Sequence, residues 1–136
     1  MSSANPIKAV DILLIEDDEP IRHLLVNALR QCGYSISEAA NGRAAMRLNS
    51  THTFRLVITD LFMPEMDGLE VIMDHNRLRP DVPLLAMTGG YHYSAPEETL
   101  KMARALGSHA TIRKPFELVD FLKTVQVLLG GPVDVR

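Results

Sequence analysis

The chain has 136 residues, the length of a single domain, since domains of roughly 100–200 residues are typical. With 14 Lys and Arg against 17 Asp and Glu, its formal charge of −3 argues against general binding to DNA or to an anionic membrane. The apolar fraction of 46% predicts a packed core. A single cysteine excludes an internal disulfide, and because no apolar leader precedes the domain, we expect a cytoplasmic protein.

Strands and helices alternate from the start of the chain. We predict that residues 1–8 are a disordered lead-in and that residues 9–130 form one domain. Residues 9–15 form a nearly continuous apolar run, which is typical of a strand that is covered on both faces. Asp18 and Pro20 then predict the start of a helix, as its N-cap and its first residue.

The same alternation continues to the end of the domain. Further strands are predicted over residues 34–39, 56–60, 83–88 and 110–113, each followed by an amphipathic helix, and residues 131–136 are predicted to be a loose tail. Five strands alternating with five helices indicate an α/β fold, a flavodoxin-like, doubly wound parallel sheet of order 2-1-3-4-5. In such sheets the ligand site lies beyond the carboxyl ends of the strands.

Polar residues stand at those strand ends. Glu16 and Asp17 follow the first strand, Asp60 ends the third, Thr88 ends the fourth and Lys114 follows the fifth. Facing carboxylates repel one another unless a proton or a cation lies among them, and Mg²⁺ suits oxygen ligands. With a lysine and a hydroxyl opposite, the set matches the needs of phosphoryl transfer to an aspartate.

Each residue taken alone also has an ordinary structural explanation, so the interpretation depends on their joint placement. The five histidines show no metal-ligand spacing, which favours surface or structural roles. Cys32, near the end of the first helix, is expected to be a small buried side chain.

Three stretches carry a resemblance to a known family. They are residues 12–22 with Glu16-Asp17-Asp18, residues 56–70 with Asp60, Met63-Pro64 and Asp67-Gly68, and the segment Lys114-Pro115-Phe116. Together they resemble the receiver domains of two-component response regulators, and the resemblance covers residues 9–129.

The resemblance implies a signalling phosphoacceptor rather than an enzyme. Asp60 would take a phosphoryl group from the phosphohistidine of a sensor histidine kinase or a histidine phosphotransfer protein, giving a 4-aspartylphosphate. Asp17, Asp60, Glu16 and the backbone carbonyl of Phe62 would hold Mg²⁺. Thr88 and Lys114 would contact the phosphoryl group, and the peptide bond from Lys114 to the following proline would be cis.

The resemblance also implies that phosphorylation switches a surface made by the fourth helix, the fifth strand and the fifth helix. We expect that surface to bind an output protein that the sequence does not identify, or a second copy of the chain. The net charge argues against DNA or a membrane as its partner. The usual aromatic switch residue is replaced by Thr111, and residues 89–95 form a longer loop than is usual. Phe62 and Gly90 offer no polar side chain to orient water, so slow autodephosphorylation is expected.

Two other functions use the same fold. A dehalogenase-type phosphatase would pair a nucleophile after the first strand with an acid two positions on, here Asp17 and Glu19, which is a poor match. A flavin or nucleotide binder of flavodoxin type needs a small-residue phosphate loop there, whereas residues 16–19 are all acidic.

Overall fold

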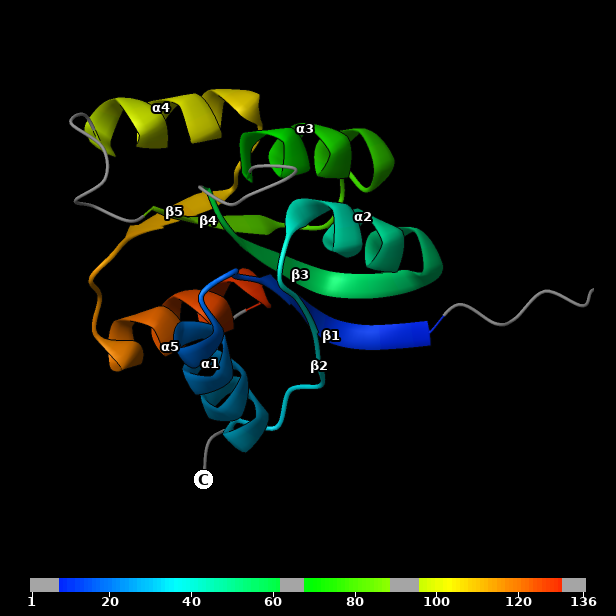
Figure 1. Ribbon diagram of the computed structural model, residues 1–136, viewed down its shortest axis with the longest axis vertical. Helices are drawn as coiled ribbons and strands as arrows, with labels where there is room; N and C mark the ends of the chain where they lie inside the picture. The colour runs from blue at the N-terminus through cyan, green and yellow to red at the C-terminus, as the bar shows by residue number, and fades with distance from the viewer. Residues whose placement is uncertain (1–7, 62–67, 89–95, 131–136) are drawn as a thin grey trace, which may run out of the picture.

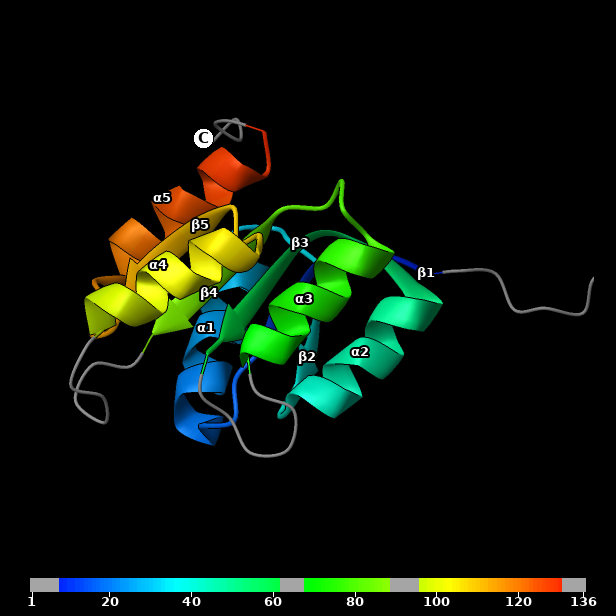
Figure 2. The ribbon, with the colours of Figure 1, turned by 90° about the horizontal axis from the view of Figure 1, so that it is seen from above.

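The structure, a computed structural model, describes residues 8–61, 68–88 and 96–130. In chain order, the elements are β1 (Lys8–Ile15), α1 (Glu19–Gln31), β2 (Ile36–Ala39), α2 (Gly42–Thr51), β3 (His52–Asp60), α3 (Gly68–Leu78), β4 (Leu84–Thr88), α4 (Pro96–Leu106), β5 (Ala110–Arg113) and α5 (Leu118–Leu128). The strands pair in parallel in the order β2-β1-β3-β4-β5. Helices α2, α3 and α4 cover one face of the sheet, and α1 and α5 cover the other (Figure 1 and Figure 2). The predicted fold class and strand order are confirmed.

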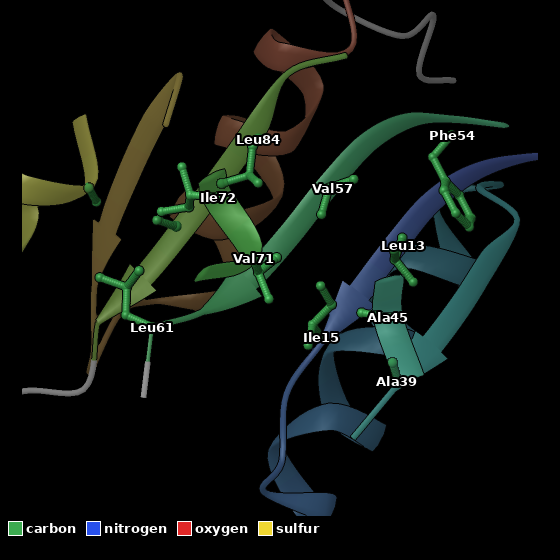
Figure 3. Close-up of a cluster of buried hydrophobic side chains, with 12 residues drawn as sticks. Leu13, Ile15, Ala39, Ala45, Phe54, Val57, Leu61, Val71, Ile72 and Leu84 are labelled. Atoms are coloured by element: carbon green, nitrogen blue, oxygen red, sulfur yellow. The ribbon is translucent and has the colours of Figure 1, made fainter. Parts of the chain in front are cut away.

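Alternate side chains of the central strands pack into two separate cores. Leu13, Ile15 and Val57 belong to the core beneath α2, α3 and α4, part of which Figure 3 shows. Leu14 and Ile58 belong to the core on the side of α1 and α5. Because both faces of each central strand are buried, these strands are continuous apolar runs in the sequence rather than alternating ones.

Helix α1 begins as the sequence predicts. Its N-cap is Asp18, whose Oδ1 accepts a hydrogen bond from the Ile21 amide at 3.0 Å, and a proline lies in the first turn. The prediction for Cys32 is wrong, because its side chain is exposed. Cys32 is the C-cap of α1, beyond the turns that pack on the sheet, and Gly33 follows with a φ of 96°.

Two strand boundaries differ from the prediction. Strand β3 begins at His52 because its first residues pair with the start of β1. Thr53 and Arg55 are exposed there, so this half of the strand lacks the continuous apolar pattern. Strand β2 begins only at Ile36, because the Tyr34 amide donates to the last turn of α1 instead.

The predictions for the ends of the domain fall mostly outside the described residues. The proposed lead-in reached residue 8, but β1 already begins there. The remaining lead-in and the tail of residues 131–136 are not among the described residues. Within the described residues, every helix is too short or too polar to cross a bilayer.

Candidate functional site

The strand register brings the residues at the strand ends to one edge of the sheet. Ile15 of β1 lies opposite Thr59, the last residue but one of β3, so Glu16 follows β1 beside Asp60. On the other side, the amide of Lys114 donates to the Thr88 carbonyl at 2.7 Å. Sites predicted from four different strands therefore converge at the carboxyl edge, where such folds bind ligands.

Three carboxylates gather at this edge. One oxygen each from Glu16, Asp17 and Asp60 lies within 4.8 Å of the other two. Glu16 and Asp60 are buried, whereas Asp17 is exposed at the surface. Three oxygen donors of this kind, two of them buried, fit a hard divalent cation that retains water on its open side, as Mg²⁺ does.

Lys114 supplies the counter-charge from the end of β5. Its Nζ lies 2.6 Å from Glu16 Oε1 and 3.6 Å from Asp60 Oδ2. The peptide bond that joins it to Pro115 is cis, as the resemblance implies. The ammonium is therefore held mainly by Glu16 and only loosely by Asp60.

Two buried oxygens at the site lack a partner. Within the described residues, Asp60 Oδ1 and Thr88 Oγ1 make no hydrogen bond, although both atoms are inaccessible to solvent. Leaving such a group unpaired costs on the order of 1–3 kcal/mol, so buried oxygens are normally satisfied. Within the part of the chain that the structure describes, a carboxylate oxygen and a hydroxyl thus stay unbonded near a lysine.

Burial also sets the protonation of the acidic pair. It raises the pKa of Glu16 to about 7, with the neighbouring Asp60 charge acting in the same direction and Lys114 opposing it. Burial raises the pKa of Asp60 as well, against the attraction of Lys114. One ammonium does not offset this concentration of negative charge, and a bound cation would lower both pKa values. The residues present therefore fit a Mg²⁺ site.

Gly68 packs closely against the backbone of Asp60 and Leu61. Its amide donates to the Leu61 carbonyl at 2.8 Å, and a Cβ built on it would lie 2.3 Å from the Asp60 carbonyl oxygen. Only a residue without a side chain allows this approach. The sequence contained the signal, a glycine just after the loop that follows Asp60, but its role was not predicted.

Arg22 also contacts the site and was given no role from the sequence. It projects from α1 and bonds the Glu16 backbone carbonyl and the Glu38 carboxylate at the end of β2. Glu38 lies 16 residues away along the chain, so no local pattern indicates the pair.

Other predicted participants lie apart from the cluster or outside the described residues. The Thr111 hydroxyl accepts a bond of 3.3 Å from Arg104 on α4, at a partly exposed position of β5. Phe62 and the segment of residues 89–95 are not described. The phosphatase alternative is not supported, since Glu19 is exposed on α1 and its nearest ionic partner is His23 at 3.9 Å.

Comparison with known proteins places this geometry in a family. Residues 12–126 match the family model described as the response regulator receiver domain. The response regulator receiver protein CpdR of Brucella abortus is 32% identical over 120 residues, which cover 87% of this chain and 95% of that protein. The chain spans half or less of the length of several other relatives, transcriptional regulators among them.

Solved structures agree with the family match. A CheY-like receiver domain from Methanospirillum hungatei superposes with a TM-score of 0.79 at 27% identity, over 91% of this chain and 94% of that one. The response regulator TrrA of Thermotoga maritima, solved in complex with Mg²⁺ and BeF, gives a TM-score of 0.75 at 29% identity, over 90% and 99% of the two chains.

Proposed function

The chain belongs to the response regulator receiver domain family, whose members are phosphoacceptor signalling domains of two-component systems, and we propose that Asp60 is its phosphoacceptor. The observation that carries this proposal is the buried Asp60 Oδ1, which has no partner among the described residues and lies on a carboxylate beside Lys114. A buried carboxylate that keeps one oxygen unbonded favours a ligand that supplies the missing contact, such as a cation or a phosphoryl group.

In the proposed reaction, a carboxylate oxygen of Asp60 forms a bond to the phosphorus of a phosphohistidine. The bond between phosphorus and the imidazole nitrogen breaks, and that nitrogen leaves with the electron pair. The product is an aspartyl phosphate, and the donor returns to free histidine. The chain contributes mainly position and charge, which is typical of phosphoryl transfer.

We propose that Glu16, Asp17 and Asp60 hold Mg²⁺, together with the backbone carbonyl of Phe62. The cluster of their oxygens within 4.8 Å supports the three carboxylates. When bound, Mg²⁺ supplies positive charge against the oxygens of the incoming phosphoryl group. Asp17, as the exposed member, leaves the solvent side of the cluster open to the donor.

Lys114 and Thr88 are proposed to bind the phosphoryl group on Asp60. Lys114 is held by Glu16 at 2.6 Å in this structure, and a phosphoryl group on Asp60 offers its ammonium a stronger partner. The buried Thr88 hydroxyl, which is unbonded within the described residues, would donate to a phosphoryl oxygen. Both changes pull on β4 and β5 and so connect phosphorylation to the neighbouring surface.

Receiver domains interact with histidine kinases, and we propose a sensor kinase or a histidine phosphotransfer protein as the phosphodonor. The output is proposed to be a protein contact with the surface of α4, β5 and α5, made by a separate partner or a second copy. The net charge of −3 disfavours a direct contact with DNA or a membrane. The single thiol fits a reducing compartment, so we propose a cytoplasmic location.

The proposal is tested by incubating the protein with acetyl phosphate and Mg²⁺ and measuring its intact mass. We expect one added phosphoryl group in the wild type. We expect none when EDTA is present and none in the variant Asp60→Asn. Asp11→Asn is the matched control, because Asp11 lies on β1 away from the cluster and bonds Arg55 and Ser35. An adduct that survives Asp60→Asn would refute the assignment.

A further inference from the structure

Arg22 contacts the backbone of the acidic loop rather than its carboxylates. Its Nη1 donates to the Glu16 backbone oxygen at 2.8 Å, and its Nε lies 3.0 Å from Glu38 Oε1. The side chain is only 13% exposed, compared with 57% for Arg55, so the guanidinium is held in one place. The planar guanidinium, whose N–H groups form a fork of donors, thereby joins α1, the end of β2 and the peptide that precedes Asp17.

The remaining contacts of the loop leave Asp17 dependent on its backbone. The Glu16 amide donates to Ala39 at 3.1 Å, and the Asp18 amide donates to Glu16 Oε2 at 3.2 Å. Among the described residues, no hydrogen bond or ion pair fixes the Asp17 carboxylate itself. Its position therefore depends on the peptide between Glu16 and Asp17, whose carbonyl Arg22 holds.

We propose that Arg22 is a positioning residue for the cation site, which fixes the backbone that carries Asp17. This inference rests on the proposed function, because it presupposes that Glu16, Asp17 and Asp60 bind a divalent cation. Residues that orient metal ligands from outside the coordination shell typically change metal affinity about 10–100-fold when they are removed.

Simple electrostatics predicts the opposite effect, and this makes the inference testable. Arg22 is a cation bonded to the backbone of the acidic loop, so its removal should not weaken cation binding if only its charge mattered. If positioning matters, Arg22→Met should weaken binding despite the loss of positive charge. Arg22→Lys keeps the charge but not the planar fork, so it should also bind more weakly than the wild type.

The experiment titrates the purified 136-residue chain with Mn²⁺ and follows free Mn²⁺ by electron paramagnetic resonance. We expect Arg22→Met to raise the Kd about tenfold and Arg22→Lys to raise it less. The rate of phosphorylation by acetyl phosphate at saturating Mg²⁺ should stay near that of the wild type. A general structural defect would lower that rate as well, so the split between affinity and rate identifies positioning.

Arg55→Met is the matched control. Arg55 also bonds one carboxylate and one backbone carbonyl, Asp11 and Leu129, each at 3.2 Å, but it does so away from the acidic cluster. The Mn²⁺ affinity of Arg55→Met should equal that of the wild type. If Arg22→Met unfolds, Arg22→Lys carries the test, because its aliphatic stem and charge are retained.

Failure of the inference and failure of the proposed function give different results. Unchanged or tighter Mn²⁺ binding by the Arg22 variants would overturn the positioning role of Arg22. If Asp17→Asn still loses Mn²⁺ binding in that case, the proposed cation site itself is supported. Absence of saturable Mn²⁺ binding by the wild type, or full binding by Asp17→Asn, would overturn both.

Discussion

Buried polar groups at the two ends of the strands differ in how completely they are bonded. At the carboxyl edge of the sheet, Asp60 Oδ1 and Thr88 Oγ1 have no partner among the described residues. At the opposite edge, the fully buried ring of His75 is bonded at both nitrogens, with Nδ1 3.0 Å from Asn49 Nδ2 and Nε2 2.9 Å from the Val82 carbonyl oxygen. The second arrangement fits a neutral ring with its proton on Nε2.

The difference separates a structural group from the proposed phosphoacceptor. The His75 ring ties the ends of α2 and α3 to the start of β4, and burial lowers its pKa. Arg79 adds bonds from Nη2 to the carbonyls of Asn49 and His52, with its Nε left unpaired within the described residues. Asp60, by contrast, lies at the carboxyl edge of the sheet with an oxygen, Oδ1, that has no partner within the described residues. Completeness of bonding, and not burial alone, distinguishes the two.

The largest expected effect is the loss of phosphorylation in Asp60→Asn. Because this change removes a buried carboxylate whose charge is poorly compensated, the free energy of unfolding should stay equal or rise. Intact mass with acetyl phosphate and Mg²⁺ measures the first effect, and urea unfolding in EDTA measures the second. A marked loss of stability would mean that Asp60 serves the fold as well.

The opposite result is expected for His75→Ala. It removes two hydrogen bonds and leaves a cavity, so the free energy of unfolding should fall by about 3 kcal/mol. Phosphorylation at a temperature where the variant is folded should continue. His23→Ala, at a side chain that is 60% exposed on α1, is the control and should leave stability unchanged. Loss of phosphorylation in folded His75→Ala would contradict a purely structural role.

Gly68→Ala should disturb the reactive region through its backbone. A methyl group there would meet the Asp60 carbonyl oxygen at 2.3 Å and the Leu61 Cα at 2.4 Å, so the backbone that carries the proposed phosphoacceptor must shift. We expect a loss of about 2 kcal/mol in stability and slower phosphorylation. Gly33→Ala, strained by its φ of 96° but away from the carboxylates, should lose stability without slowing phosphorylation. Equal phosphorylation rates in both variants would exclude the backbone effect.

The pH dependence of stability should reveal the buried histidine. Because burial lowers the pKa of His75 below its ordinary 6.5, the unfolded chain takes up a proton first on acidification. The contribution of neutral His75 to the free energy of unfolding is fully present above pH 6.5, the ordinary pKa. It is lost as the pH falls through the lower folded-state pKa. His109 and Arg79 lower this pKa further, and the Val82 carbonyl opposes them.

The contribution is measured as the difference in unfolding free energy between the wild type and His75→Gln. Urea titrations in EDTA, from above neutrality down to about pH 5, give this difference. The buried carboxylates titrate with the opposite sign, but they do so in both proteins and cancel. A difference that does not shrink on acidification would show that the folded-state pKa of His75 is not lowered.

The smallest effect concerns the lifetime of the phosphorylated state. The residue two positions after Asp60 is Phe62, which has no polar group to orient an attacking water molecule. Phe62→Asn should therefore speed loss of the phosphoryl group severalfold, while Phe62→Leu should not. Decay after removal of acetyl phosphate, followed by intact mass, compares them. Unchanged or slower decay in Phe62→Asn would contradict this explanation.

Much of the fold could be predicted because its physical signals are local. The apolar run of β1 and the cap at Asp18 each depend on neighbouring residues. Strand β3 was predicted too short because Thr53 and Arg55 are exposed. Its amino-terminal half forms through pairing with β1, which is remote in sequence.

The candidate site could be predicted only as a set of strand-end residues. Its chemistry depends on distant pairs, such as Lys114 with Glu16, which are 98 residues apart. The sequence pointed to Lys114 but did not reveal that Glu16, rather than Asp60, holds it most closely. The roles of Arg22 and Gly68 arise only when helices and strand ends meet.

The identity of the phosphorylated residue is the most direct test of the central claim. Treating the phosphorylated protein with borohydride converts an aspartyl phosphate to homoserine, and peptide mass spectrometry then locates the altered residue. We predict homoserine at Asp60 and aspartate unchanged at Asp17. Homoserine at Asp17, or a phosphoryl group retained on a histidine, would contradict the view that the Asp60 carboxylate at the end of β3 is the acceptor.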